Sequence, residues 1–233
     1  MKKLMIICGG QSTEHSISRM SCTSVLKNLH RERYVLTLVG IDRDGQWYLL
    51  DDTQEDLSLD SWLDNAQEIT DIYNLLKNQD VIFPVLHGQY GEDGTIQGLF
   101  ELVNVPYVGC RTFASSVAMD KIYTKKILET VGIPQVKSLY IKKRYDEQYV
   151  VVDHQFQEHK DILNWVEDKL GFPCFVKASR SGSSVGCYRV DQKEQFLDIL
   201  HQAGQYDSHI VVEECIDCIE LETAVLGNDD PIV

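Results

Sequence analysis

Short apolar runs alternate with helical patterns over the first 110 residues of the chain. Strands are expected at runs of apolar or β-branched residues, at 3–8, 34–41, 47–50, 80–86 and 105–109. The run 80–86 (DVIFPVL) is almost wholly apolar, which is typical of a strand in a sheet that is buried on both faces. Helical spacing predicts a helix at 16–29, with apolar positions at Ile17, Met20, Val25 and Leu29. A second helix is expected to begin at Thr95 as its cap. This alternation predicts an α/β fold with a doubly wound parallel sheet.

The second half of the chain follows a different order. A helix is expected at 121–130, capped by Asp120 and ended by Gly132 and Pro134. Further strands are expected at 138–141, 174–177, 187–190, 209–213 and 220–226, and further helices at 160–170 and 192–203. The boundary between two domains is therefore expected near Thr112 to Asp120.

A loop of small residues joins two of these strands. Residues 179–186 (SRSGSSVG) contain two glycines and four serines, and Lys177 leads into them. Backbone N–H groups can approach an anion closely in such a loop, and a lysine can contact a phosphate as a point charge. Because strands flank the loop and no helix opens there, it is neither a Walker A loop nor a dinucleotide fingerprint. Taken alone, the loop is explained better as an ordinary flexible hairpin, and only the rest of the chain favours a phosphate loop.

Two strand-end loops carry candidate binding residues. The loop 9–18 (GGQSTEHSIS) places Glu14 at a helix start, where the carboxylate can hold an ammonium group or simply interact with the helix dipole. The loop 86–95 (LHGQYGEDGT) places His87 where it can hydrogen-bond a carboxylate or serve as a turn residue. Further along, Lys121 is by default a surface lysine. Glu213, Glu214 and Glu220 are explained equally well by an acidic strand edge.

Charge and cysteine content exclude several classes of partner. The net charge of −14 argues against nucleic acid and anionic membranes as partners. The first eight residues lead directly into Gly9 and a polar stretch, so they indicate a first strand and not a signal peptide. Four of the seven cysteines (Cys8, Cys22, Cys174 and Cys187) lie in strand-like or helical runs, which favours reduced thiols and a cytoplasmic location. Cys215 and Cys218 form a CxxC pair, but no second pair or nearby histidine completes a zinc site.

Taken together, these segments resemble the D-alanine–D-alanine ligases, a family within the ATP-grasp superfamily. The resemblance extends from residue 4 to 227. It is carried by five stretches in the family's order: GGQSTEHSIS, LHGQYGEDGTIQGLFELVNVPYVGC, ASSVAMDK, GFPCFVKASRSGSSVG and VVEECIDCIELETAVLG. The second and third are the most specific. The resemblance implies a substrate-binding α/β domain at 1–118, a central ATP-grasp subdomain at 119–208 and the start of a C-terminal lobe at 209–233.

The resemblance also implies roles for residues at matching positions. Glu14 would hold the ammonium group of the first D-alanine, with His87 beside its carboxylate, and Ser183 would hydrogen-bond toward Glu14. The implied ATP-binding residues are Lys121, Lys177, Ser181, Gly182, Ser183, Ser184, Glu213, Glu214, Ile216 and Glu220. Glu14 and Ser183 are accordingly the candidate catalytic residues. Three positions depart from the common family pattern, Ala178, Ser181 and Cys215, and Cys215 implies a looser adenine pocket.

Family members are longer than this chain, and the resemblance implies that their remaining part holds three things. These are the ligands for Mg²⁺ (or Mn²⁺), an arginine that stabilises the intermediate, and a mobile loop. No metal ligand is therefore expected within residues 1–233, the ATP-grasp domain is expected to be incomplete, and the isolated chain is expected to be inactive. Order is expected over 1–118 and is expected to decay from Val211 onward. A homodimer is the assembly that the resemblance implies for the full-length enzyme.

The implied reaction is ATP-dependent ligation for peptidoglycan synthesis. ATP would phosphorylate the carboxylate of D-alanine, and the amine of a second D-alanine would attack the acyl phosphate, with catalysis mostly by positioning and charge stabilisation. D-Serine or D-lactate as the second substrate remains an alternative. A nucleotide-binding module without turnover is the alternative outside this enzyme class.

Overall fold

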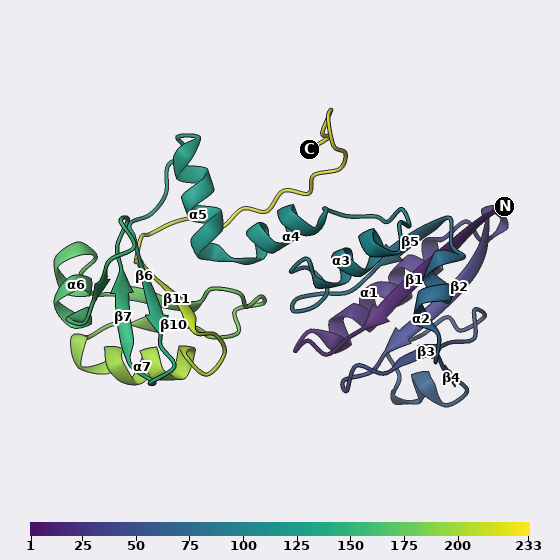
Figure 1. Ribbon diagram of the computed structural model, residues 1–233, viewed down its shortest axis with the longest axis horizontal. Helices are drawn as coiled ribbons and strands as arrows, with labels where there is room; N and C mark the ends of the chain where they lie inside the picture. Colours follow the sequence, from purple (N-terminus) through teal and green to yellow (C-terminus); the bar gives the residue numbers. More distant parts are fainter.

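The computed structural model describes residues 1–233, and the chain forms two lobes that each surround their own β-sheet (Figure 1). The first lobe contains a five-stranded sheet and the second a six-stranded sheet. Two short helices connect the lobes, α4 (Thr112–Met119) and α5 (Lys121–Thr130). Asp120 lies between them and caps α5 as predicted, because its Oδ1 accepts the N–H groups of Ile122 at 3.0 Å and Tyr123 at 3.3 Å.

The first sheet has the order β4-β3-β2-β1-β5. Its strands are β1 (Lys2–Gly9), β2 (Tyr34–Ile41), β3 (Trp47–Leu49), β4 (Gln67–Glu68) and β5 (Val81–Pro84). Strand β1 runs parallel to both β2 and β5, so the predicted parallel core is confirmed. Strands β3 and β4 add an antiparallel edge, with β3 paired to β2.

Helices cover both faces of this sheet. Helix α1 (His15–Asn28) lies on one face, and α2 (Ile72–Lys77) and α3 (Thr95–Leu102) lie on the other. Successive side chains of β1 alternate between two cores, with Ile6 in the α1 core and Met5 and Ile7 in the core shared with α2 and α3. Figure 1 shows the sheet between these layers. The C-terminal ends of the parallel strands therefore meet at one edge, which faces the second lobe.

Helix α1 buries only two of the four apolar positions that its sequence suggests, Val25 and Leu29, which are partly buried against the core. Ile17 and Met20 are exposed, and the buried face includes the polar residues Ser18, Arg19 and Thr23. Contacts of Arg19 explain why this polar face is turned inward. Its Nε donates to the carbonyl of Leu57 at 2.7 Å, and its guanidinium lies 4.6 Å from the ring centroid of Trp62. The helix thus packs on the loop 51–63 through hydrogen bonds and a cation–π contact, which periodicity of apolar residues cannot predict.

Two further local expectations for the first lobe are wrong. The N-cap of α3 is Gly94, with φ of +91°, and Thr95 is the first helical residue. Asp93 serves the helix start instead, because its Oδ1 accepts the N–H of Thr95 at 3.0 Å. The expected strand 105–109 reduces to a single bridge between Ile82 and Tyr107.

The second sheet is antiparallel and has the order β10-β9-β11-β6-β7-β8. Its strands are β6 (Ser138–Lys143), β7 (Tyr149–Val152), β8 (Glu158–His159), β9 (Cys174–Ala178), β10 (Cys187–Val190) and β11 (His209–Glu214). Helices α6 (Ile162–Lys169) and α7 (Phe196–Ala203) pack on one face around Val166, Phe196 and Leu200. Helix α5 contacts β11 on the opposite face of the sheet. Lys121 of α5 and residues of β9 and β11 line one cavity on that face.

Regular structure ends at Glu214. Strand β11 pairs with β9 on one side and β6 on the other, so the expected loss of order from Val211 is wrong for residues 211–214. Residues 209–214 of the expected third part therefore belong to the same sheet as the expected second part. The predicted strand 220–226 is wrong, because residues 215–233 form only an isolated bridge between Leu226 and Ile232. None of the helices is long and apolar enough to cross a membrane.

Two leucines of α7 test the proposed core of the second lobe. Leu200 is fully buried, whereas Leu197 on the same helix is 42 % exposed. We expect Leu200→Ala to lower the free energy of unfolding by about 2–5 kcal/mol, because it leaves a cavity. The matched variant Leu197→Ala should cost less than about 1 kcal/mol. Urea unfolding followed by circular dichroism measures both, and equal losses would contradict the packing of α7 described here.

Candidate active site

The Gly/Ser loop between β9 and β10 presents a row of free backbone donors. The N–H groups of residues 181–184 donate no hydrogen bond within the chain. Ser183 and Ser184 adopt left-handed φ values of +47° and +60°, and the N–H of Val185 donates to the carbonyl of Gly182 at 2.9 Å to close the turn. Consecutive N–H groups in such a turn form a concave anion-binding nest. The backbone of this loop therefore leaves four consecutive N–H groups without a partner in the chain.

This loop forms one wall of a cavity of about 610 Å³. Every residue that the sequence assigned to nucleotide binding lines it, namely Lys121, Lys177, Ser181, Gly182, Ser183, Ser184, Glu213, Glu214, Ile216 and Glu220. Cys187 and Cys218 also line the cavity. The structure thus brings together residues from α5, β9, the loop, β11 and the segment that follows β11.

Three charged side chains form a bridge, and two of them, Lys177 and Glu213, line the cavity. Nζ of Lys177 lies 2.6 Å from Oε2 of Glu213, and Nζ of Lys125 lies 2.7 Å from Oε1 of the same residue. Burial alone would raise the pKa of Glu213, but the hydrogen bonds from the two lysines outweigh it and lower that pKa. Lys125 was missed by the sequence reasoning, although its place one turn after Lys121 on a helix puts both on the same face.

The ammonium group of Lys121 binds the base of the loop. Its Nζ donates to the carbonyl of Ser181 at 2.6 Å and to the carbonyls of Ala178 and Ser179 at 3.3 Å each. Burial, followed by the nearby charge of Lys177, lowers the pKa of Lys121. Lys121 is therefore not the surface lysine that is the default interpretation of its sequence context.

The other half of the site lies at the strand ends of the first lobe. Gly9 and Gly10 follow β1 with φ values of +89° and +92°, and a Cβ at Gly9 would overlap the carbonyl oxygen of Ile41. Ser18 joins two strand ends, because its hydroxyl accepts the N–H of Gly9 at 2.8 Å and donates to the carbonyl of Val85 at 2.5 Å. These contacts fix the loop that carries Glu14.

Glu14 is the point where the two lobes meet. The hydroxyl of Ser183 donates to Oε1 of Glu14, 169 residues away in the sequence. Oε2 lies against the backbone of Gly88 and Gly182, where a Cβ at Gly88 would overlap it. The carboxylate predicted to hold an ammonium group therefore touches the loop predicted to hold phosphates.

His87 lies next to Gly88, and its side chain is about one third exposed. Its Nε2 lies 3.0 Å from the hydroxyl of Ser21 on α1, and its Nδ1 lies 3.9 Å from Oε1 of Glu92. His87 also lines a separate cavity of about 380 Å³ at the C-terminal ends of β1 and β5. The two candidate residues of the first lobe are thus on adjacent loops, as the parallel sheet requires.

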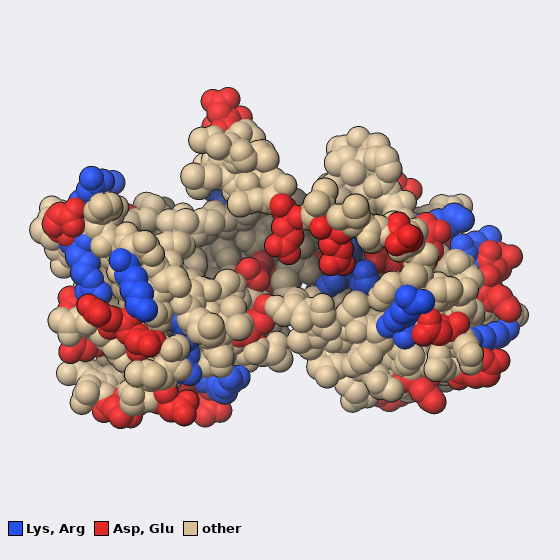
Figure 2. Space-filling view, turned by 180° about the vertical axis from the view of Figure 1, so that it is seen from behind, with Lys and Arg blue, Asp and Glu red and all other residues tan.

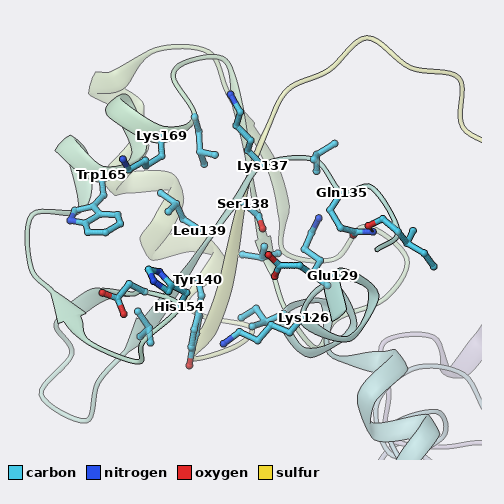
Figure 3. Close-up of a pocket in the computed structure, with 18 of the residues that line it drawn as sticks. Lys126, Glu129, Gln135, Lys137, Ser138, Leu139, Tyr140, His154, Trp165 and Lys169 are labelled. Atoms are coloured by element: carbon cyan, nitrogen blue, oxygen red, sulfur yellow. Dashed lines mark hydrogen bonds between the residues drawn. The ribbon is translucent and has the colours of Figure 1, made fainter. Parts of the chain in front are cut away.

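Another hollow, of about 680 Å³, lies between α5, β6 and α6 (Figure 3). Figure 3 shows Trp165 and His154 on one side of it and Lys126 and Glu129 on the other. None of the predicted site residues lines this hollow, although Lys125 contributes to its wall.

Figure 2 shows both lobes from behind, with acidic and basic side chains interspersed over their outer surfaces.

Two family models match the chain. The model described as D-ala D-ala ligase N-terminus matches residues 3–110, and the model described as D-ala D-ala ligase C-terminus matches residues 127–233. A curated relative, the D-alanine–D-alanine ligase of Acetivibrio thermocellus, is 40 % identical over 99 % of this chain and 66 % of its own length. The chain therefore spans about two thirds of the length of this relative.

Solved structures have the same fold. The VanG D-Ala:D-Ser ligase from Enterococcus faecalis superposes with a TM-score of 0.86 at 33 % identity, covering 99 % of this chain and 67 % of that one. The D-alanine–D-alanine ligase from Bacillus anthracis complexed with ATP gives a TM-score of 0.66 at 26 % identity, covering 93 % of this chain and 60 % of that one. With both family models matched in order along nearly its whole length, the chain belongs to the D-alanine–D-alanine ligase family.

Proposed function

We propose that this protein is an ATP-dependent D-alanine–D-alanine ligase, and that residues 1–233 supply its nucleotide cavity and first amino-acid site. The observation that carries the proposal is the row of free N–H groups at 181–184, which faces a cavity shared with Lys121 and Lys177. Backbone donors and ammonium groups together suit a polyphosphate. An ATP complex of a related Bacillus anthracis ligase supports this assignment.

The cavity divides into parts that match the parts of ATP. Its cationic and N–H-rich part, at Lys121, Lys177 and the loop, is assigned to the phosphates. Glu213, Glu214 and Ile216 are assigned to the adenine pocket, and Glu220 to the ribose hydroxyls, because carboxylates accept hydrogen bonds from hydroxyl and amino groups. The described residues contain no group of three or more His, Cys, Asp or Glu side chains placed to hold a metal ion, so we assign no step to Mg²⁺ here.

The first D-alanine is assigned to the junction of the lobes. Glu14 offers a carboxylate for its ammonium group, and His87 on the adjacent loop is assigned to its carboxylate. Ser183 links Glu14 to the loop, so the amino acid and the terminal phosphate would lie on either side of one short contact. This arrangement brings the carboxylate oxygen of the substrate toward the phosphorus that it attacks.

The reaction follows from this placement. A carboxylate is a poor electrophile, and transfer of the terminal phosphoryl group of ATP converts it into an acyl phosphate and releases ADP. The amine of a second D-alanine then attacks the carbonyl carbon, phosphate leaves and a peptide bond forms. The loop N–H groups and the lysines would stabilise the charge on the transferred phosphoryl group.

D-Serine is the second candidate for the second substrate. The observation that favours it is the similarity to the VanG D-Ala:D-Ser ligase. In either case the first amino acid and the nucleotide would bind as described, so the two activities differ only in the attacking amine. A binding module without turnover remains the alternative outside this class, and phosphate release from ATP in the presence of D-alanine distinguishes it from a ligase.

We place the enzyme in the cytoplasm as a homodimer. All seven cysteines are free thiols, which supports a reducing compartment. Leu102 and Phe113 are 82 % and 77 % exposed on the neighbouring helices α3 and α4, and such side chains are suited to a subunit interface. The net charge of −14 supports small-molecule substrates and not nucleic acid as partners.

Lys177 provides the first test of the nucleotide site. We expect Lys177→Ala to weaken ATP binding by about tenfold or more, because a hydrogen bond to a charged group is worth about 1.5–3 kcal/mol. Isothermal titration with ATP measures the effect. Lys142→Ala is the matched control, because Lys142 lines a different hollow on the same sheet and should leave affinity unchanged. Unchanged affinity in Lys177→Ala, with the fold intact, would remove Lys177 from the site.

Glu14 provides the test of the amino-acid site. As an anchor for the ammonium group, Glu14→Gln should abolish the saturation-transfer NMR signal of D-alanine and leave the melting temperature almost unchanged. As a helix-dipole charge alone, it should lower the melting temperature and leave the signal intact. Glu32→Gln, an exposed acid of the same lobe, is the control. A normal D-alanine signal in Glu14→Gln would exclude the anchor role.

A further inference from the structure

The first arm of the nucleotide loop is held by buried side chains from outside the loop. Residues 178–181 lead from β9 to the tip, and the N–H of Ser179 donates to the carbonyl of His209 at 2.9 Å. The hydroxyl of Ser179 donates to Oδ1 of Asp120 at 2.6 Å, and both of these side chains are buried. The tip at 182–184 has no comparable support apart from the contact of Ser183 with Glu14. The loop thus consists of a fixed arm and an open tip.

Asp207 is the most heavily bonded residue of this support. It lies in the turn between α7 and β11, and its side chain is 3 % exposed. Its Oδ2 accepts the backbone N–H of Arg180 at 2.9 Å and Nε–H of Arg180 at 3.0 Å. Its Oδ1 accepts Nη2–H of Arg180 at 2.5 Å and the N–H of His209 at 3.0 Å. Four donors on one buried carboxylate leave it little freedom to move.

The same turn supports the other end of the loop. Gly186 has a φ of +67°, and a Cβ there would lie 2.8 Å from Cβ of Ala178 and 3.1 Å from the ring of Tyr206. Tyr206 immediately precedes Asp207, so both ends of the loop lie against residues 206–207. No substrate or nucleotide role is assigned to this turn, and none of its residues lines the nucleotide cavity.

Fixing the arm also decides which way its peptide groups point. The carbonyls of Ala178, Ser179 and Ser181 point toward Nζ of Lys121, and the N–H of Arg180 points toward Asp207. Because the carbonyl and the N–H of one trans peptide point in opposite directions, the peptide that follows Ser181 turns its N–H away from Lys121. The contact with Lys121 therefore orients the N–H of Gly182, the second of the four free N–H groups.

We propose that Asp207 is a positioning residue for the nucleotide loop, which it holds through Arg180 so that the N–H groups of residues 181–184 are preorganised for phosphate. This inference rests on the proposed nucleotide site. Asp207 does not touch the nucleotide in this scheme. Its effect reaches the phosphates only through the geometry of the arm.

The sign of the effect separates positioning from simple electrostatics. Asp207 is an anionic residue near a site for an anion, so neutralising it should strengthen ATP binding if charge alone mattered. The same holds if Arg180 were a direct phosphate ligand, because loss of the Asp207 charge would release its guanidinium. A positioning role predicts the opposite. In Asp207→Asn the amide NH₂ faces N–H donors, so at least one of the two acceptor sides is lost.

The test is ATP binding by the Asp207→Asn variant of this chain, measured by isothermal titration. We expect the dissociation constant for ATP to rise about tenfold, the scale of lost charged hydrogen bonds. Adenosine affinity should stay unchanged, because the arm supports only the phosphate end of the cavity. The matched control is Asp191→Asn, which removes an exposed carboxylate that pairs with Arg189 on β10 of the same hairpin.

A second readout requires no ligand. Tryptic cleavage after Arg180, quantified by mass spectrometry as a fraction of the intact chain, should accelerate in Asp207→Asn and not in Asp191→Asn. Arg180→Lys serves if Asp207→Asn does not fold. It keeps the charge and the backbone N–H but loses the forked side-chain contact, and it should also weaken ATP binding while sparing adenosine.

The outcomes separate this inference from the proposed function. Tighter or unchanged ATP binding in Asp207→Asn would overturn the positioning role while leaving the nucleotide site intact. Equal weakening for ATP and adenosine would also overturn it, because that pattern indicates general damage to the cavity. No ATP binding by the unaltered chain would overturn both the nucleotide site and the inference built on it.

Discussion

The contact between the Lys121 ammonium group and three carbonyl oxygens determines the geometry of the whole candidate site. A half-buried ammonium group needs acceptors for its donors, and here the base of the Gly/Ser loop supplies them. In return the loop loses its freedom to turn those carbonyls toward the cavity. Asp120, which caps α5 and accepts the hydroxyl of Ser179, places the helix start against the same arm. The nucleotide loop, the helix that joins the lobes and the second sheet are thereby fixed relative to each other.

A contact at the junction of the lobes links the Gly/Ser loop to the proposed site for the amino-acid substrate. Ser183 at the tip of the loop contacts Glu14, which the glycine turns after β1 hold at the edge of the first sheet. The proposed site for an ammonium group and the proposed site for phosphates thus share one contact between the two lobes. Formation of an acyl phosphate needs this proximity, because most of the rate acceleration in phosphoryl transfer comes from positioning and charge stabilisation. The same contact explains why neither lobe contains a complete site of its own.

Local patterns predicted the parts of this fold whose causes are local. The apolar runs of β1, β2 and β5, the cap at Asp120 and the hairpin around the Gly/Ser loop were confirmed, since each depends on residues within a few positions. Ile17 and Met20 were misplaced because Arg19 finds its partners in the distant loop 51–63. Segment 220–226 has strand-like residues, but a strand also needs a pairing partner, and only Leu226 at its end forms a bridge, with Ile232. Lys125 and Asp207 were missed because their partners, Glu213 and Arg180, lie 88 and 27 residues away.

The central claim is that the four free N–H groups of residues 181–184 receive the phosphates of ATP. Titration of the ¹⁵N-labelled chain with ATP, followed by the amide resonances, tests it most directly. The account predicts that the amides of Ser181, Gly182, Ser183 and Ser184 shift downfield together as new hydrogen bonds form, and that adenosine does not reproduce the shift. Shifts confined to residues of the hollow in Figure 3, such as Leu139 and Tyr140, would contradict it, as would unchanged loop amides at saturating ATP.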